Sequence, residues 1–258
     1  MKNRSFAILV IVSFLVATEL QFYYVLTPAF FNQSGGPYNA STLAGILDDK
    51  TAAADLVTAG DKDGNNKLSL KELEDLAPSR SDAKRVLDAE EAVVRSKGGV
   101  RLAESSVPIV MTLGQICEML ILLMLPVFLK HLGFRTTIAL GIAAWSVRYF
   151  IFAWCPSPAL VIASQTLHGF GFAFFFVGGF IYGDRIAGKE IKASAQALLL
   201  LVTYGVGMLV SSLVAGPISD YFHRDWHKLF LVPAVLTAIC TVLFFAIFRE
   251  DEQPIEAS

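Results

Sequence analysis

Six apolar runs dominate this sequence, and each is long enough to cross a lipid bilayer as a helix. A membrane-spanning helix needs about 20 predominantly apolar residues, and a soluble amphipathic helix is apolar on one face only. The chain is 54% hydrophobic with a mean hydropathy of +0.56. These properties predict an all-α, polytopic membrane protein with six transmembrane helices. The runs cover residues 5–29, 106–130, 134–154, 157–182, 193–217 and 228–248.

The first run has a second interpretation. Lys2 and Arg4 precede FAILVIVSFLVA, an arrangement typical of the start of a secretory signal. However, the apolar character continues through LQFYYVLTPAFF, and only Glu19 interrupts it. No small-x-small cleavage site ends the run. We expect a membrane span here, and a cleaved signal would leave five spans.

Charge is concentrated between the first two runs. Residues 29–104 hold 23 of the 44 Asp, Glu, Lys and Arg residues. This shift predicts a polar insert between two membrane segments. The expected organisation is a first transmembrane helix (1–31), a helical insert (32–104), a bundle of five transmembrane helices (105–250) and a tail (251–258).

Lys and Arg gather in alternate loops, which indicates the orientation in the membrane. With the N-terminus inside, the short outside loops carry only Arg224 and Lys228. We therefore expect both termini in the cytoplasm and residues 32–104 outside, in a plasma or inner membrane. The inside segments then carry Lys2, Arg4, Lys130, Arg135, Arg185, Lys189, Lys192 and Arg249.

The insert contains DKDGNNKLSLKE at residues 61–72, which resembles the calcium loop of an EF-hand. The flanking segments 48–59 and 70–76 read as helices, and Pro78 ends the second. Position 6 is Asn66 instead of Gly, and Asn tolerates the left-handed turn needed there. The expected ligands are Asp61, Asp63, Asn65, Lys67 through its carbonyl, Ser69 and Glu72.

A loop outside the cell would meet steady calcium, so a weak structural site with a dissociation constant on the order of 10⁻⁴–10⁻³ M would stay occupied. The alternative is a solvated acidic turn. No second loop of this kind is visible, and calcium is the one cofactor that the sequence indicates. Asn32 and Asn39 begin Asn-x-Ser triplets, which matter only in a cell that glycosylates.

Other classes of function lack support in the sequence. The net charge of −2 gives no reason to expect a nucleic-acid partner. No nucleophile–base pair or phosphate loop is visible, so an enzyme is not expected. The three cysteines read as small buried residues, and His223 and His227 read as an exposed turn or, alternatively, a metal pair.

Polar residues inside the apolar runs are the candidate functional residues, because such groups are costly in a bilayer. Gln115 and Glu118 lie three apart and share a helix face, as do Gln21 and Tyr24. Structural alternatives exist: Glu118 can pair with Arg148, and a histidine can simply join two helices. The remaining candidates are Glu19, Arg148, and the pair His168 and Phe172, four apart.

These motifs together resemble the C-terminal half of the nucleoside:proton symporter family of the major facilitator superfamily. The resemblance rests on TELQFYY, Q-I-x-E at 115–118, P-x-F-L-K/x-x-G at 126–133, A-W-x-x-R-[FY] at 144–149, LHGFGFAFFFVGG and A-S-A-Q at 193–196. It covers nearly all of residues 1–30 and 105–250. The family's fold has two six-helix bundles that rock around a solute bound between them.

The resemblance implies that Gln21, Gln115 and Glu118 bind a nucleoside, with Glu118 also coupling transport to protons. It implies that Phe172 and His168 line the cavity, where relatives carry a tyrosine at the histidine position. Tyr24 stands where well-known members have Asn, and Ala173 where many have Asp. Both departures bear on which solute is selected. Arg148 and Glu19 are the further candidates for proton coupling.

The expected function is therefore one half of a transporter that takes up nucleosides or related polar solutes with protons. Six spans lack the opposite wall of the cavity, so a fragment of a longer gene, a separate second half or a dimer are all open. One alternative is a calcium-binding membrane protein that does not transport. Another is a facilitator half for a different solute.

Overall fold

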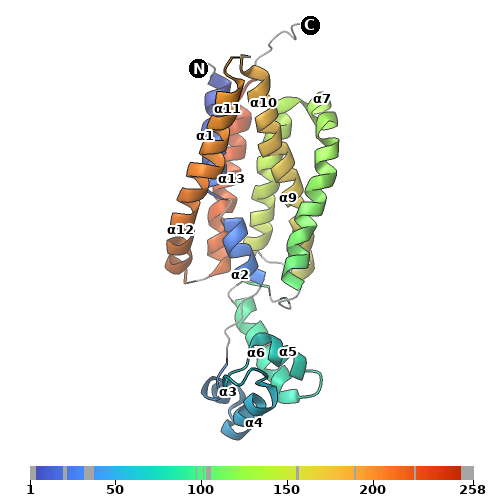
Figure 1. Ribbon diagram of the computed structural model, residues 1–258, viewed down its shortest axis with the longest axis vertical. Helices are drawn as coiled ribbons and strands as arrows, with labels where there is room; N and C mark the ends of the chain where they lie inside the picture. The colour runs from blue at the N-terminus through green and yellow to red at the C-terminus, as the bar shows by residue number, and fades with distance from the viewer. Residues whose placement is uncertain are drawn as a thin grey trace. The chain divides into compact units, whose positions relative to one another are not determined.

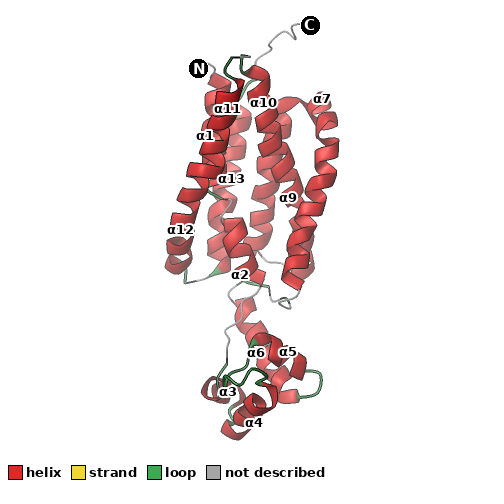
Figure 2. Ribbon diagram, in the orientation of Figure 1, coloured by secondary structure: helices red, strands yellow, loops and turns green. Residues whose placement is uncertain are grey.

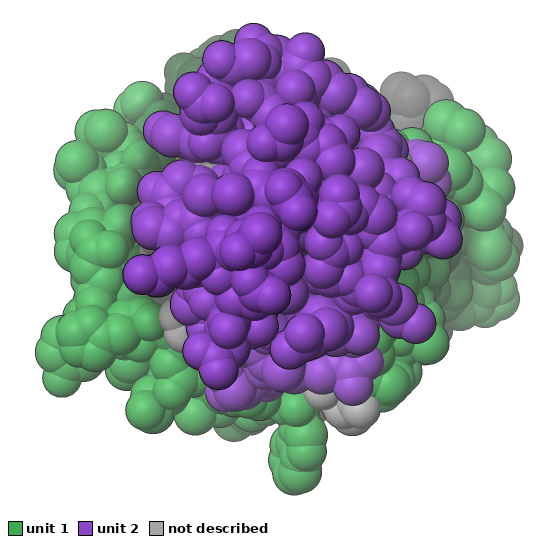
Figure 3. Space-filling view, turned by 90° about the horizontal axis from the view of Figure 1, so that it is seen from below, with its two compact units in different colours: residues 1–27, 110–258 green, residues 28–109 purple. Residues whose placement is uncertain are grey.

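The fold is that of a computed structural model, described for residues 4–19, 22–31, 38–96, 98–100, 102, 106–154, 157–188, 190–223 and 225–250. It divides into two units, one of residues 1–27 with 110–258 and one of residues 28–109 (Figure 3). Over the described residues the regular structure is helical, with one isolated bridge in place of a sheet (Figure 2).

Five apolar helical segments are long enough to cross a membrane, so the expected class of all-α polytopic protein is confirmed. Proline and short irregular turns interrupt several of them. The segments comprise α1 (Arg4–Ala17), η1 (Phe22–Leu26) and α2 (Thr27–Phe31); α7 (Val107–Trp154); α8 (Pro158–Ala163), η3 (Ser164–Thr166), α9 (Leu167–Phe170), η4 (Gly171–Val177) and α10 (Gly178–Ile186); α11 (Lys192–Leu200), η5 (Leu201–Gly207) and α12 (Met208–Tyr221); and α13 (Trp226–Ile247).

The longest segment, α7, is a hairpin and contains two of the six expected spans. Its 48 residues are interrupted at Gly133, whose φ of 74° and ψ of 172° are not helical. We call residues 107–132 the first arm and 134–154 the second arm. Glu118 of the first arm contacts Gly169, and Trp145 of the second arm contacts Gly171, so the two arms return past the same helix (Figure 1).

The hairpin turn needs glycine for two reasons. A positive φ is strained for a residue with a side chain, and a Cβ at Gly133 would lie 2.5 Å from Oε1 of Glu250. The backbone N–H of Arg135 donates to that same oxygen at 2.8 Å, and Nε of Arg135 donates to the carbonyl of Phe245 at 2.8 Å. The turn is thereby fixed to the end of α13.

Side-chain hydrogen bonds join helices that are distant in sequence, as expected where no water competes. Ser146 Oγ donates to the carbonyl of Ala234 at 2.9 Å. Tyr149 OH donates to the carbonyl of Glu19 at 3.1 Å. Because α1 packs against η5 and α13, the first apolar run is an integral helix of the bundle.

Three of the spans contain a π-helical turn: η1, η4 and η5. A π turn adds a residue to the helical register and rotates the side chains that follow. Such turns are frequent at functional sites. Here η1 carries Tyr24 and η4 carries Phe172, two of the candidate residues.

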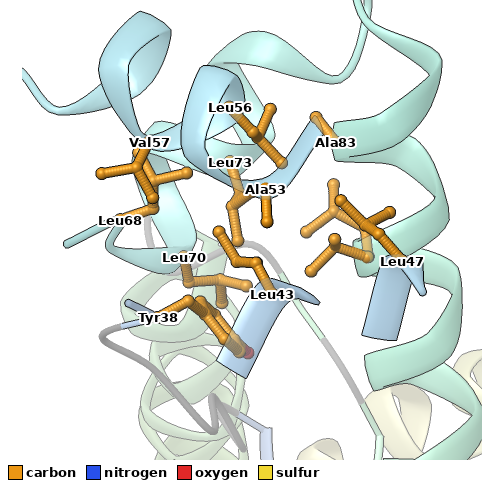
Figure 4. Close-up of a cluster of buried hydrophobic side chains, with 12 residues drawn as sticks. Tyr38, Leu43, Leu47, Ala53, Leu56, Val57, Leu68, Leu70, Leu73 and Ala83 are labelled. Atoms are coloured by element: carbon orange, nitrogen blue, oxygen red, sulfur yellow. The ribbon is translucent and has the colours of Figure 1, made fainter. Parts of the chain in front are cut away.

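Over its described residues, the second unit forms four helices around its own core, and two of them correspond to the segments 48–59 and 70–76 that were expected to be helical. The helices are α3 (Ala40–Leu47), α4 (Lys50–Gly60), α5 (Leu70–Leu76) and α6 (Ser81–Ser96). Twelve buried side chains form the core, among them Leu43, Leu56, Leu73 and Val86 (Figure 4). The segment 61–69 is thus a loop between two packed helices.

The calcium-like loop pairs with a segment of the insert that is not itself a calcium loop. Tyr38 and Leu68 form an antiparallel bridge through two 2.8 Å hydrogen bonds. Each is followed by a capping residue and a helix: Asn39 before α3 and Ser69 before α5. Position 8 of the loop therefore has its partner within the insert. Asn32 lies outside the described residues, while the Asn39 side chain accepts from the N–H of Thr42.

The packing of the second arm on η4 predicts the effect of one added methyl group. A Cβ at Gly141 would lie 2.6 Å from the backbone nitrogen of Phe175, which cannot move aside. We expect Gly141→Ala to destabilise the bundle by about 1–3 kcal/mol. Thermal unfolding in detergent measures the change.

The matched control is Gly178→Ala on α10, since the nearest atom to the added Cβ there, a side-chain carbon of Ile138, is 3.5 Å away, an ordinary contact. Both changes raise helix propensity equally, so only the contact differs. Equal melting temperatures for the two variants would contradict the close packing of the second arm on η4.

Candidate functional site

A cleft of about 400 Å³ gathers most of the candidate residues of the bundle. Three segments contribute to its walls: η1, the first arm of α7, and the stretch from α9 to η4. The lining residues are Tyr24, Gln115, Glu118, Met119, Leu122, His168 and Phe172. Five of the six residues expected to bind solute therefore meet at one site. The sixth, Gln21, lies outside the described residues.

The first arm supplies one continuous face to the cleft. Gln115, Glu118, Met119 and Leu122 follow the spacing of three, four and seven that places side chains on one side of a helix. Gln115 and Glu118 were expected from the sequence. Met119 and Leu122 were not, although this same spacing identifies them. Glu118 lies near the middle of the arm, far from either end.

A second wall of the cleft is built from His168 and Phe172, four residues apart across the start of the π turn. Gly169 and Gly171 lie between them in the sequence, where Gly169 contacts the backbone of Glu118 and Gly171 contacts the ring of Trp145. These contacts bring the backbones close together. The rings of His168 and Phe172 lie 6.3 Å apart. The rings of Phe172 and His168 thus line the same cleft as the polar side chains of the first arm.

Two tyrosines of η1 complete the site in different ways. Tyr24 lines the cleft and is 44% exposed. Tyr23 is buried and its ring stacks on His168, with centroids 4.4 Å apart and planes 20° apart. The sequence analysis did not identify Tyr23, because a straight α-helical reading of TELQFYY gives no reason to select it.

Arg148 lies behind this wall and is 1% exposed. Its Nη1 is 3.2 Å from Nδ1 of His168, and its guanidinium stacks over the ring of Tyr23 at 4.2 Å. Among the described residues no ion pair joins Arg148 directly to Glu118. Instead, Nε2 of His168 lies 3.9 Å from Oε2 of Glu118, so the histidine stands between the two charged groups.

Glu19 occupies a separate position. Its side chain is buried, and its Oε2 has no hydrogen-bond partner within the described part of the chain. Its backbone carbonyl accepts from the hydroxyl of Tyr149 and from the N–H of Tyr23. The residue does not line the cleft.

The calcium-like loop forms a second candidate site, within the insert. Oxygens of Asp61, Asp63 and Glu72 lie within 4.8 Å of one another. Asn66 adopts the left-handed turn that position 6 requires, with φ of 56°. Hard oxygen ligands on a turn of this kind suit Ca²⁺.

Hydrogen bonds within the loop hold its carboxylates in place. The N–H groups of Ser69 and Lys62 donate to Glu72 at 2.8 and 2.9 Å and hold the pKa of Glu72 below its usual range. Asn65 donates to Asp63, and the hydroxyl of Ser69 donates to Glu72. Lys67 is exposed within the loop.

No other His, Cys, Asp and Glu cluster with metal-like spacing occurs among the residues the structure describes. In the HRDWH turn, Nδ1 of His227 lies 2.6 Å from the carbonyl oxygen of Ala153. Cys117 and Cys240 are free, and Cys155 falls outside the described residues.

Comparison with known proteins assigns a family to the bundle. The model of the nucleoside H⁺ symporter family matches residues 91–253, more than half of the chain. The xanthosine permease of Escherichia coli (strain K12) is 32% identical over 154 residues, which cover 57% of this chain and 37% of that protein. The nucleoside permease NupG of the same organism is 30% identical over 149 residues, 55% of this chain and 36% of that protein.

Solved structures agree on the fold. A crystal structure of a variant of the nucleoside transporter NupG aligns with 96% of this chain and 49% of that chain, with a TM-score of 0.62 and 23% identity. The chain thus spans less than two fifths of the curated relatives and about half of the solved one. Since the family model matches more than half of the chain, including α7 and the α9–η4 stretch of the cleft, the chain belongs to the nucleoside H⁺ symporter family.

Proposed function

We propose that this chain forms one half of a transporter that takes up nucleosides together with protons. The observation that carries the proposal is the cleft, where an amide, a carboxylate, an imidazole and aromatic rings from three spans meet at mid-helix depth. Such groups are costly in a bilayer, and where they occur they commonly mark the path of a solute or an ion. A calcium-binding protein that uses its helices only as an anchor would have no need of them.

The lining matches the chemistry of a nucleoside. The amide of Gln115 donates and accepts, as the edge of a base or a ribose does. The ring of Phe172 offers a face on which a base can stack. Tyr24 adds a hydroxyl on the accessible side, and Gln21, close to it in sequence, is proposed to act with Gln115.

Glu118 is the proposed site of proton coupling. Its side chain is 21% exposed to the cleft and lies beside His168, so a proton and a solute can both reach it. Glu19 is the second candidate, since its side chain is buried and its Oε2 has no hydrogen-bond partner among the described residues. Arg148 is proposed to act on coupling through His168.

A second six-helix body is proposed to supply the opposite wall. Tyr24 and Met119 are 44% and 66% exposed although they line the cleft, so one side of the site is uncovered by this bundle. The partner is a further segment of the same protein, a separate chain or a second copy. In the membrane, both termini are placed in the cytoplasm and residues 32–104 outside, on the distribution of Lys and Arg.

We further propose that the loop 61–72 binds calcium as a structural ion. The convergence of Asp61, Asp63 and Glu72 favours this role over a solvated turn. The residues that would hold the ion are Asp61, Asp63, Asn65, the carbonyl of Lys67, Ser69 and Glu72. The bridge between Tyr38 and Leu68 fixes the loop without a second calcium loop.

Replacing Glu118 by Gln tests the coupling role. We expect Glu118→Gln to abolish uptake driven by a pH gradient while expression stays intact, because the amide keeps the shape and loses the ionisable group. Uptake of labelled nucleosides into vesicles carrying the assembled transporter measures this.

Glu19→Gln is the matched variant, since Glu19 is the other carboxylate at bilayer depth in the described chain. It should keep gradient-driven uptake. If Glu19→Gln abolishes that uptake and Glu118→Gln does not, the coupling role belongs to Glu19.

Calcium binding to the full chain in detergent tests the insert. We expect one site with a dissociation constant on the order of 10⁻⁴–10⁻³ M by equilibrium dialysis. Because the folded-state pKa of Glu72 lies below its usual 4.5, binding should persist from neutral pH down to about 4.5 and weaken as pH falls further.

Asp61→Asn removes a ligand charge and should weaken binding at least tenfold. Asp88→Asn, on α6 away from the loop, should leave binding unchanged. Equal calcium affinity in these two variants would show that the loop is only a solvated turn.

A further inference from the structure

The contact between Arg148 and His168 fixes which ring nitrogen of the histidine carries the proton. Nη1 of Arg148 lies 3.2 Å from Nδ1 of His168, and both side chains are buried. A guanidinium has only donors and does not lose its charge in proteins. Nδ1 must therefore accept, so the ring proton is on Nε2.

The other ring nitrogen faces the cleft. Nε2 of His168 lies 3.9 Å from Oε2 of Glu118. This is too long for a direct hydrogen bond, but a water or a solute group can bridge such a gap. The cleft thus presents an N–H donor beside a carboxylate acceptor.

Aromatic rings hold the guanidinium where it is. Its carbon lies 4.2 Å from the ring centre of Tyr23 and 5.0 Å from that of Tyr149. The ring of Tyr23 also stacks on His168. One tyrosine therefore fixes both members of the hydrogen bond, and neither can turn away without losing two contacts.

We propose that Arg148 is a positioning residue that locks His168 as a neutral Nε2–H donor, so that of the two cleft residues Glu118 alone exchanges protons. The role in transport rests on the proposed function; the tautomer itself does not. A histidine beside a carboxylate is ordinarily the first candidate for a proton switch. Here a second ring proton on Nδ1 would point at a group that only donates. The charged or titratable groups facing the ring are Glu118, Arg148, Tyr23 and Tyr24.

Nitrogen NMR of the full chain, labelled with ¹⁵N-histidine in lipid nanodiscs, tests this directly. His168→Gln assigns the signal by its loss. We expect His168 to keep one bare and one protonated ring nitrogen, the bare one being Nδ1, from pH 8 to pH 5.5. Free histidine, recorded over the same pH range, serves as the reference for a doubly protonated ring. A doubly protonated His168, or a proton on Nδ1, would overturn the inference.

Two substitutions test whether a side chain that only donates is needed at position 148. Arg148→Lys keeps a cation that only donates and should retain the wild-type pattern. Arg148→Gln brings an amide that also accepts, and should let His168 gain a proton on Nδ1 in acid. An unchanged pattern in Arg148→Gln would contradict the role of Arg148.

Should either variant fail to fold, the wild-type titration decides alone. The NMR pattern does not depend on transport, so failure of the inference and failure of the proposed function are distinguishable. Absent uptake with the expected tautomer would reject the function only. Gradient-driven uptake with a charged His168 would reject the inference only.

Discussion

The close approach of the α7 hairpin to the α9–η4 stretch is the contact on which the bundle's site depends. Gly169 contacts the backbone of the first arm at Glu118, and Gly171 contacts Trp145 of the second arm. A side chain at either glycine would push an arm away. Because both arms lie this close, Glu118 and Arg148 reach His168 from opposite sides although 30 positions separate them in the sequence.

The membrane class and the family were predictable because they depend on features that a sequence displays directly. Apolar length alone indicates a span, and the break at Gly133 falls between two such runs. The shared face of Gln115 and Glu118 follows from spacing, and the structure places both in one cleft. Their binding roles stay predictions, as does that of Gln21.

Other features of the site depend on tertiary contacts that spacing does not show. The π turns displace the register by one residue, so Tyr23 reaches His168 and Tyr24 reaches the cleft. The sequence suggested Glu118 as the partner of Arg148, whereas the structure places His168 between them. In the insert, the bridge from Tyr38 to Leu68 joins residues 30 apart and has no sequence signal of its own.

The charges at bilayer depth impose a further constraint on the proposed cycle. A buried cation is costly unless it is compensated, and Arg148 is compensated by rings and a neutral imidazole, with no carboxylate in direct contact in the described structure. In that cycle, the carboxylate of Glu118 balances the cation across His168 whenever it is ionised. A proton on Glu118 therefore leaves the cleft with a net positive charge, and the field of Arg148 acts against keeping it there. In the proposed cycle, proton binding and release at Glu118 thus change the charge that a solute would meet, while the fixed donor on His168 stays the same.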